Sequence, residues 1–202
     1  MTALLKPSPG VSFFLVIFGA WALTSINLAR ASRVKEPAFT IVGKYNGFEL
    51  RSYGVILKAS TPLDGREGRN MDQGFRRLAR YIFGGNSEAQ QIAMTAPVIR
   101  EGGAGHWQLS FVMPAGMSFQ DLPDPIDERV SLSPVPARTM AALRFSGWAT
   151  NRRVKKHTAK LLVRLEEQGI GHTGEAMVAQ YDPPFRLPFM RRNEILVEVA
   201  QP

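Results

Sequence analysis

The sequence of 202 residues contains no cysteine, which excludes disulfide bonds, thiol catalysis and thiolate metal sites. It has three histidines, His106, His157 and His172, and their spacing fits no metal motif such as H-E-x-x-H. The nucleophile-elbow, phosphate-loop and dinucleotide-binding motifs are missing as well. These absences favour a ligand-binding protein over an enzyme.

The remaining composition is typical of a folded domain. Hydrophobic residues make up 45% of the chain, which is enough to build a core. The length suggests one domain of ordinary size with additional segments. The net charge of +8 favours anionic partners without identifying them.

The N-terminal segment differs from the rest of the chain. Residues 11–29 carry no charge, and Phe13 to Phe18 are entirely apolar. This run is just long enough to span a membrane. It also resembles a signal peptide, with Lys6 before the apolar run and Ala29-Arg30-Ala31 as a cleavage site. We therefore predict a signal peptide or membrane anchor over residues 1–31, a linker over 32–38 and a domain over 39–200.

The side of the membrane on which the domain lies has two interpretations. An export signal places the domain on the periplasmic side, which we favour. More positive charges follow the apolar run than precede it, and this bias favours the cytoplasmic side instead. The predicted location is therefore membrane-anchored or exported.

The first half of the domain predicts strands around one helix. Residues 40–45 and 48–53 flank Asn46-Gly47, a strong signal for a two-residue hairpin turn. A strand over 55–60 follows, and then a helix from Asn70 to Phe83 that ends at Gly84-Gly85. Two further strands are predicted over 91–99 and 106–113.

The second half repeats this order of elements. A strand over 139–145 precedes a helix over 151–168, and strands over 175–181 and 194–199 follow. The predicted fold class is therefore α+β, a distorted antiparallel β-barrel of two duplicated β-α-β-β halves with two helices packed on it.

Basic residues are dense in the second predicted helix, between positions 152 and 164. A solvated helix face explains most runs of this kind. The alternative is attraction to an anionic membrane surface near the apolar segment at residues 11–29. Aromatic residues do not interleave with these charges, so we expect no nucleic-acid partner.

One loop combines apolar and cationic side chains. Residues 181–194 read YDPPFRLPFMRRNE, with three prolines among two phenylalanines and three arginines. This composition suits a ligand that is apolar in the middle and anionic at its edge. The alternative is a loop folded onto the core, in which Arg192 pairs with Glu194.

Residues 92–98, Ile-Ala-Met-Thr-Ala-Pro-Val, contain small side chains and a proline that removes a strand donor. They suit either a plain core strand or a space beside the first helix, walled by Met94, for a flat apolar ligand.

Seven segments together resemble the SOUL/haem-binding protein family, in the family's order over about residues 37–200. They are FELRSY at 48–53, GFRRLARYIFGGN at 74–86, IAMTAPV at 92–98, FVMP at 111–114, LPDP at 122–125, FSGW at 145–148, and YDPP to RRNE at 181–194. The resemblance implies a duplicated barrel and the binding of haem or a related tetrapyrrole in a shallow apolar site, as a carrier or buffer. Since similar duplicated barrels serve as effector-binding domains, a module for other amphipathic molecules is the alternative.

The resemblance also nominates residues of the binding site, between the first helix and the loop before the last strand. It implies contacts from Phe75 and Ala79 on the helix, and from Arg186 as the partner of a propionate.

Face and proximity arguments add four more residues to this site: Leu78, Ile82, Met94 and Phe189. Some family members have a histidine, proposed as an iron ligand, just before the tyrosine of the first segment. Ser52 occupies this position here. We therefore predict no metal ligand, and binding by apolar contact and propionate pairing.

Overall fold

The computed structural model describes residues 34–64, 70–103 and 105–200. The predicted signal peptide or anchor at residues 1–31 lies outside these residues, as does the start of the linker. No helix within the described ranges has the length and apolar character needed to cross a membrane.

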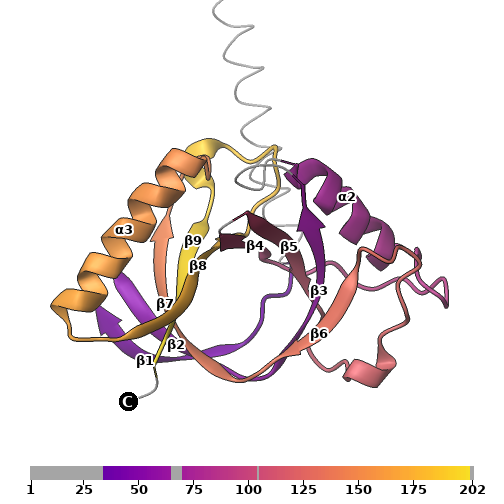
Figure 1. Cartoon of the computed structure of the whole chain (residues 1–202), viewed down its shortest axis with the longest axis horizontal. Coiled ribbons are helices and arrows are strands. Elements are labelled where there is room, and N and C mark those ends of the chain that lie inside the picture. Colours follow the sequence, from indigo (N-terminus) through magenta and orange to yellow (C-terminus); the bar gives the residue numbers. More distant parts are fainter. Residues whose placement is uncertain (1–33, 65–69, 104, 201–202) are drawn as a thin grey trace, which may run out of the picture. The chain divides into compact units, whose positions relative to one another are not determined.

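A single antiparallel sheet of nine strands forms the body of the domain (Figure 1). Its order is β1-β2-β7-β9-β8-β4-β5-β3-β6, and the sheet curves into an open, distorted barrel as predicted. The strands are β1 (Phe39–Tyr45), β2 (Phe48–Tyr53), β3 (Ile56–Leu63), β4 (Val98–Gly103), β5 (His106–Val112), β6 (Ser131–Val135), β7 (Arg138–Phe145), β8 (His172–Gln180) and β9 (Asn193–Val199).

The strand order confirms the predicted duplication. On one side of the β4–β8 pair the order is β5, β3, β6, and on the other side it is β9, β7, β2. In each half a helix connects the second strand to the third, so a pseudo-two-fold axis passes between β4 and β8. Strand β2 of the first half pairs with β7 of the second half, and β6 of the second half pairs with β3 of the first. These pairs help to join the two halves into one sheet.

Two helices cover the outer face of the sheet (Figure 1). Helix α2 (Met71–Ile82) packs on β3 and β5, while α3 (Asn151–Glu167) packs on β7, β8 and β9. Each helix shares an apolar cluster with its half of the sheet, and a third cluster lines the inner face around Met140 and Leu196. Short 3-10 helices, η2 (Phe119–Asp121) and η3 (Pro188–Met190), lie in connecting loops.

The β1–β2 hairpin turns at Asn46-Gly47, as predicted. Gly47 has a φ of +84°, and a Cβ atom there would lie 1.9 Å from the Arg164 guanidinium of α3. The positive φ favours glycine at this turn, whereas the Arg164 contact involves only the end of a flexible side chain.

Two parts of the secondary structure differ from prediction. The strand predicted over 91–99 begins only at Val98, after a cis peptide bond between Ala96 and Pro97. Strand β6 lies in the proline-rich connection, where we predicted no strand. Pro134 is accommodated because β6 is an edge strand, where a missing donor costs no ladder bond on the open side.

Candidate ligand-binding surface

The loop between β8 and β9, residues 181–192, is called the flap from here on. Its ends are joined where the Tyr181 amide donates to the Arg192 carbonyl, at 3.2 Å. Within it, the Arg186 amide donates to the Pro183 carbonyl at 3.1 Å. Asp182 accepts hydrogen bonds from the Arg192 amide and, at 2.8 Å, from the Arg186 guanidinium. The flap is therefore held in one shape by its own polar contacts.

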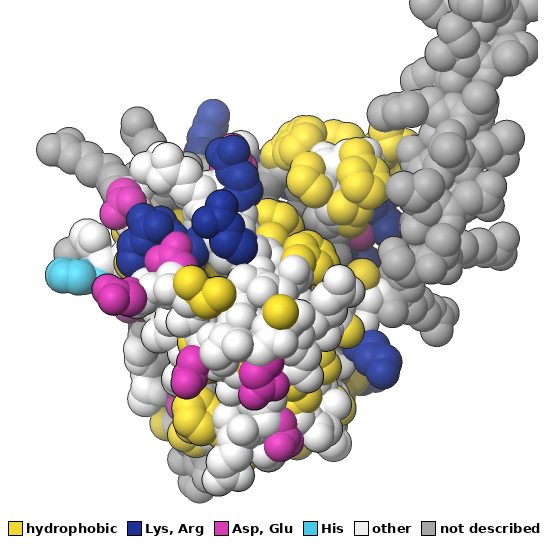
Figure 2. Space-filling view, turned by 90° about the vertical axis from the view of Figure 1, so that its right-hand side faces the viewer, with side chains coloured by type: hydrophobic (Ala, Val, Ile, Leu, Met, Phe, Trp, Pro, Cys, Tyr) yellow, Lys and Arg dark blue, Asp and Glu magenta, His cyan; other side chains and the backbone are white. Residues whose placement is uncertain are grey.

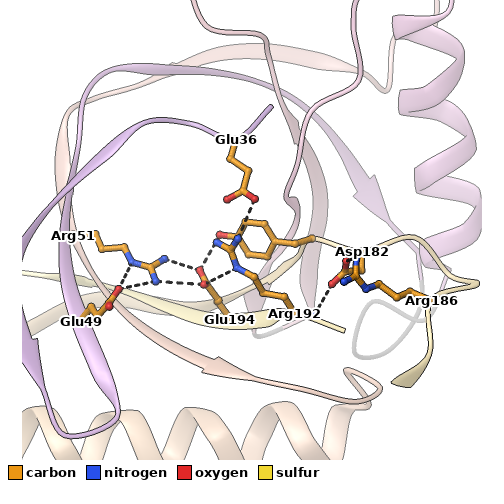
Figure 3. A network of polar contacts seen from close by, with 8 residues as sticks. Glu36, Glu49, Arg51, Asp182, Arg186, Arg192 and Glu194 are labelled. Atoms are coloured by element: carbon orange, nitrogen blue, oxygen red, sulfur yellow. Dashed lines mark hydrogen bonds and ion pairs between the residues drawn. The ribbon is translucent and has the colours of Figure 1, made fainter. Parts of the chain in front are cut away.

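A polar network on the inner face of the barrel anchors the base of the flap (Figure 3). Its centre is the buried carboxylate of Glu194, which accepts from Arg51 at 2.7 Å and from the Tyr181 hydroxyl at 2.8 Å. Arg192 donates to the same carboxylate at 3.1 Å. Glu49 completes the network by accepting from Arg51 at 2.9 Å.

The pKa values of this network follow from burial and charge. Burial alone would raise the pKa of Glu194, but the hydrogen bond and charge of Arg51, the charge of Arg192 and the hydrogen bond from Tyr181 together outweigh it, and the pKa lies below its usual value. The pKa of Tyr181 is raised by burial and by the neighbouring charge of Glu194. The carboxylate is thus held ionised and the phenol neutral, which suits a structural network.

The predicted arginine contacts of the flap divide into two groups. Arg192 pairs with Glu194, as the alternative interpretation of the loop expected, and also with Glu36 at 3.0 Å. Arg191 is buried, donates to flap carbonyls and lies 3.7 Å from the centroid of the Trp148 ring. Arg186 remains partly exposed, and its buried Nε has no hydrogen-bond partner.

The predicted contacts on α2 also divide into two groups. Leu78 and Ile82 are fully buried in the core cluster beneath the helix, so they present no surface to a ligand here. Phe75 is partly exposed, and its ring lies 5.2 Å from that of Phe111 on β5. Ala79, one turn further along, is intermediate in exposure. Of the four predicted residues on α2, only Phe75 and Ala79 are accessible at the surface.

Residues 91–97 run between α2 and the strand that leads to the flap. The Ile92 amide donates to the Ile82 carbonyl at 2.8 Å, at the end of α2. Val98 then lies opposite both Phe111 of β5 and Gln180 of β8. Two strand spacings, about 10 Å, separate the strand under Phe75 from the start of the flap. The partly exposed Met94 belongs to this intervening segment.

Trp148 is a residue that the predicted site did not include. It is exposed and stacks on Arg191, and the adjacent Gly147 amide donates to the Pro188 carbonyl of the flap at 2.8 Å. The sequence signal was present, because Trp148 lies in one of the family-like segments. Its contact with the flap depends on the tertiary structure.

The inside of the barrel contains a separate apolar cavity, lined by Tyr53, Ile99, Met140 and Leu196 among others. Its volume of about 30 Å³ has room for one or two water molecules. A tetrapyrrole does not fit in this cavity.

The three histidines lie on β5, β8 and α3. His106 and His172 are exposed at the starts of β5 and β8, and His157 stacks on Phe145 under α3. Within residues 34–64, 70–103 and 105–200, no cluster of three histidine or acidic side chains is arranged to hold a metal. Ser52 lies in β2, whose partner strands are β1 and β7.

Comparisons with known proteins agree with this architecture. The chain is 28% identical to heme-binding protein 2 of Homo sapiens over 165 residues, which is 77% of this chain and 80% of the human protein. The EcmrR C-terminal domain superposes with a TM-score of 0.58 at 12% identity, covering 77% of this chain and 98% of that one. A hydrolase from Listeria innocua superposes with a TM-score of 0.53 at 10% identity, covering 79% and 94%. At these identities the two structures establish a shared fold alone. The model of the SOUL heme-binding protein family matches residues 34–198, and the chain belongs to that family.

Proposed function

We propose that the domain binds haem or a related tetrapyrrole without a covalent bond, on the surface between α2 and the flap, and serves as a carrier or buffer. The observation that supports this most is the flap itself, where exposed Phe185 and Phe189 flank the partly exposed Arg186. Membership of a family described as heme-binding supports the same ligand class.

Apolar contact supplies the main attraction in this proposal. Phe75, Met94 and Phe189 are large side chains that remain exposed in the free domain. Covering apolar surface is worth about 25 cal/mol for each Å² removed from water. A flat macrocycle is proposed to cover these side chains.

Arg186 supplies the polar part of the proposed site. Its guanidinium has five N–H donors, and Asp182 accepts from Nη1. Nε is buried and unpartnered, while the side chain as a whole is partly exposed. A propionate of the ligand is proposed to share or replace Asp182 as the acceptor.

A binding role, rather than a catalytic one, suits the ionisable groups near the flap. Glu194, Arg51 and Arg192 are paired with one another, and Asp182 is paired with Arg186. These pairings explain each of the ionisable groups as a support for the shape of the flap.

Titration with haemin tests the proposal. We expect the full chain in lipid nanodiscs to shift the Soret band and to quench tryptophan fluorescence saturably, with protein-free nanodiscs as the blank. Phe189→Ser should weaken binding about tenfold, which corresponds to about 1.4 kcal/mol. Ile126→Ser, at a similarly exposed apolar residue beyond the C-terminal end of α2, should leave affinity unchanged. Haemin uptake no greater than in the blank would exclude the function, and displacement by unrelated lipids or drugs would favour a broader amphipathic site.

The proposed site predicts little dependence on the iron. With Ser52 at the position of the family's histidine, iron has no ligand from that residue, and apolar contact and Arg186 carry the affinity. Haemin and metal-free protoporphyrin IX should therefore bind within about tenfold of each other, or about 1.4 kcal/mol, in the same fluorescence titration. A hundredfold preference for haemin would show that another side chain ligates the iron.

A further inference from the structure

The chain enters the domain beside the flap. Lys35 forms a bridge with Thr95, in which the Ala96 amide donates to the Lys35 carbonyl at 3.0 Å. The next residue, Glu36, pairs with Arg192 of the flap at 3.0 Å. The segment before β1 is thus held between residues 91–97 and the flap.

The predicted membrane segment is separated from this entry point by a short connection. Residues 11–29 are uncharged, and only residues 30–34 separate them from Lys35. An extended chain spans at most about 3.5 Å per residue, so Lys35 lies within roughly 20 Å of the end of that segment. With residues 11–29 in a bilayer, this short connection limits how far Lys35 can lie from the lipid surface.

This end of the domain also carries exposed aromatic side chains. Phe189 is 73% exposed, Phe185 is 59% exposed and Trp148 is 51% exposed. Trp148 is joined to the flap through Arg191, so each of the three residues is part of the flap or in contact with it. Figure 2 shows hydrophobic side chains gathered at the upper edge of the domain, the edge at which Figure 1 places the flap. Aromatic side chains of this kind are enriched where proteins meet the headgroup region of a membrane.

Positive charge surrounds these aromatic residues. Lys35 is exposed at the entry point, and Arg152, Arg153 and Lys156 are exposed in the first turns of α3, which begins three residues after Trp148. The nearby carboxylates of Glu36 and Asp182 are paired with arginines of the flap. Basic residues close to an anionic bilayer contribute about 1 kcal/mol each.

We propose that the flap, Trp148 and the first turns of α3 form a lipid-binding surface that lies against an anionic phospholipid bilayer, with Phe185, Phe189 and Trp148 at the depth of the headgroups. The lipid contact is independent of any tetrapyrrole. Its consequence for ligand exchange rests on the proposed function: the site between α2 and the flap opens toward the membrane, where apolar tetrapyrroles partition.

Spin-label accessibility tests the lipid contact without a ligand. The chain has no cysteine, so F189C and I126C each provide a single labelling position, at residues 73% and 70% exposed. The full chain is reconstituted in vesicles of phosphatidylcholine with phosphatidylglycerol, and collisions with oxygen and with a water-soluble nickel complex are compared. We expect a several-fold loss of nickel collisions at position 189 and none at position 126.

The variant R152E/K156E tests the electrostatic part. In vesicles of phosphatidylcholine with phosphatidylglycerol, it should return the label at position 189 toward water, while the labelled parent chain in pure phosphatidylcholine should show the same partial return. Equal nickel accessibility at positions 189 and 126 would overturn the proposal. If the label at position 189 stays protected from the nickel complex both in R152E/K156E and in pure phosphatidylcholine, the proposed role of anionic headgroups is overturned. Haemin is absent throughout, so a failed haemin titration and a failed lipid contact are distinguishable.

Discussion

Glutamine in place of Glu194 is expected to lower the free energy of unfolding by about 3 kcal/mol. Glu194 is 1% exposed and accepts hydrogen bonds from Arg51, Arg192 and Tyr181. Breaking a buried ion pair by removing one partner costs about 3–5 kcal/mol, because the other charge stays buried. We expect the lower end of this range because Glu49 still pairs with Arg51.

Urea unfolding of the full chain measures this effect, and Glu198→Gln is a matched control. Glu198 lies on the same strand and the same face of the sheet, but its side chain is 41% exposed where it pairs with Arg138. Exposed pairs contribute about 0–1 kcal/mol, so the control should change stability little. Equal losses from the two substitutions would show that the buried network does not anchor the flap.

The difference in unfolding free energy between the parent chain and Glu194→Gln should depend on pH. The folded-state pKa of Glu194 lies below the ordinary value of 4.5, because Arg51, Arg192 and Tyr181 together outweigh the effect of burial. The unfolded chain therefore takes up the proton first as the pH falls. The stability difference between the parent and Glu194→Gln should be complete above pH 4.5 and should shrink as the pH falls through the lowered pKa. A difference that grows in acid would contradict this assignment.

Charge reversal of Arg186 to glutamate is expected to weaken haemin binding about 10- to 100-fold. A hydrogen bond to a charged group contributes about 1.5–3 kcal/mol, and the substitution also places a carboxylate against the propionate. Asp182→Asn should have the opposite effect, because it removes the carboxylate that competes for Arg186 in the free domain. Fluorescence quenching by haemin measures both affinities.

Lys44→Glu is the control for net charge in that experiment. It makes the same change of two charge units on β1, an edge strand that is separated from β8 by β2, β7 and β9. It should leave haemin affinity within about twofold, or roughly 0.4 kcal/mol. If Lys44→Glu weakens binding as much as Arg186→Glu, the attraction is a property of the net charge and not of the flap.

The sequence predicted the duplicated fold because its signals are local. Asn46-Gly47 specifies the first hairpin, and the alternation of Trp107, Leu109 and Phe111 places one face of β5 in the core. By contrast, the mostly apolar residues at 92–96 resemble a strand in sequence, but the regular pairing of β4 begins only after Pro97, at Val98. Strand β6 was not predicted because its sequence contains Pro134. A proline is tolerated in an edge strand, and the edge position of β6 is set by the sheet and not by the neighbouring residues.

The candidate site was less accessible to prediction because it depends on tertiary contacts. Leu78 and Phe75 share one apolar stripe of α2, and only the packing on β3 and β5 buries the first and leaves the second exposed. Arg51 and Glu194 are 143 residues apart, so no local pattern indicates their pairing. The contact of Trp148 with Arg191 is of the same kind.

Hydrogen–deuterium exchange of the full chain in nanodiscs, with and without haemin, tests the central claim most directly. A ligand on the surface between α2 and the flap should slow exchange at the amides of residues 91–97 and of the flap, and should leave β1, β2 and β6 unchanged. Haemin-dependent slowing confined to the strands around the inner cavity, or no slowing at all, would contradict the account.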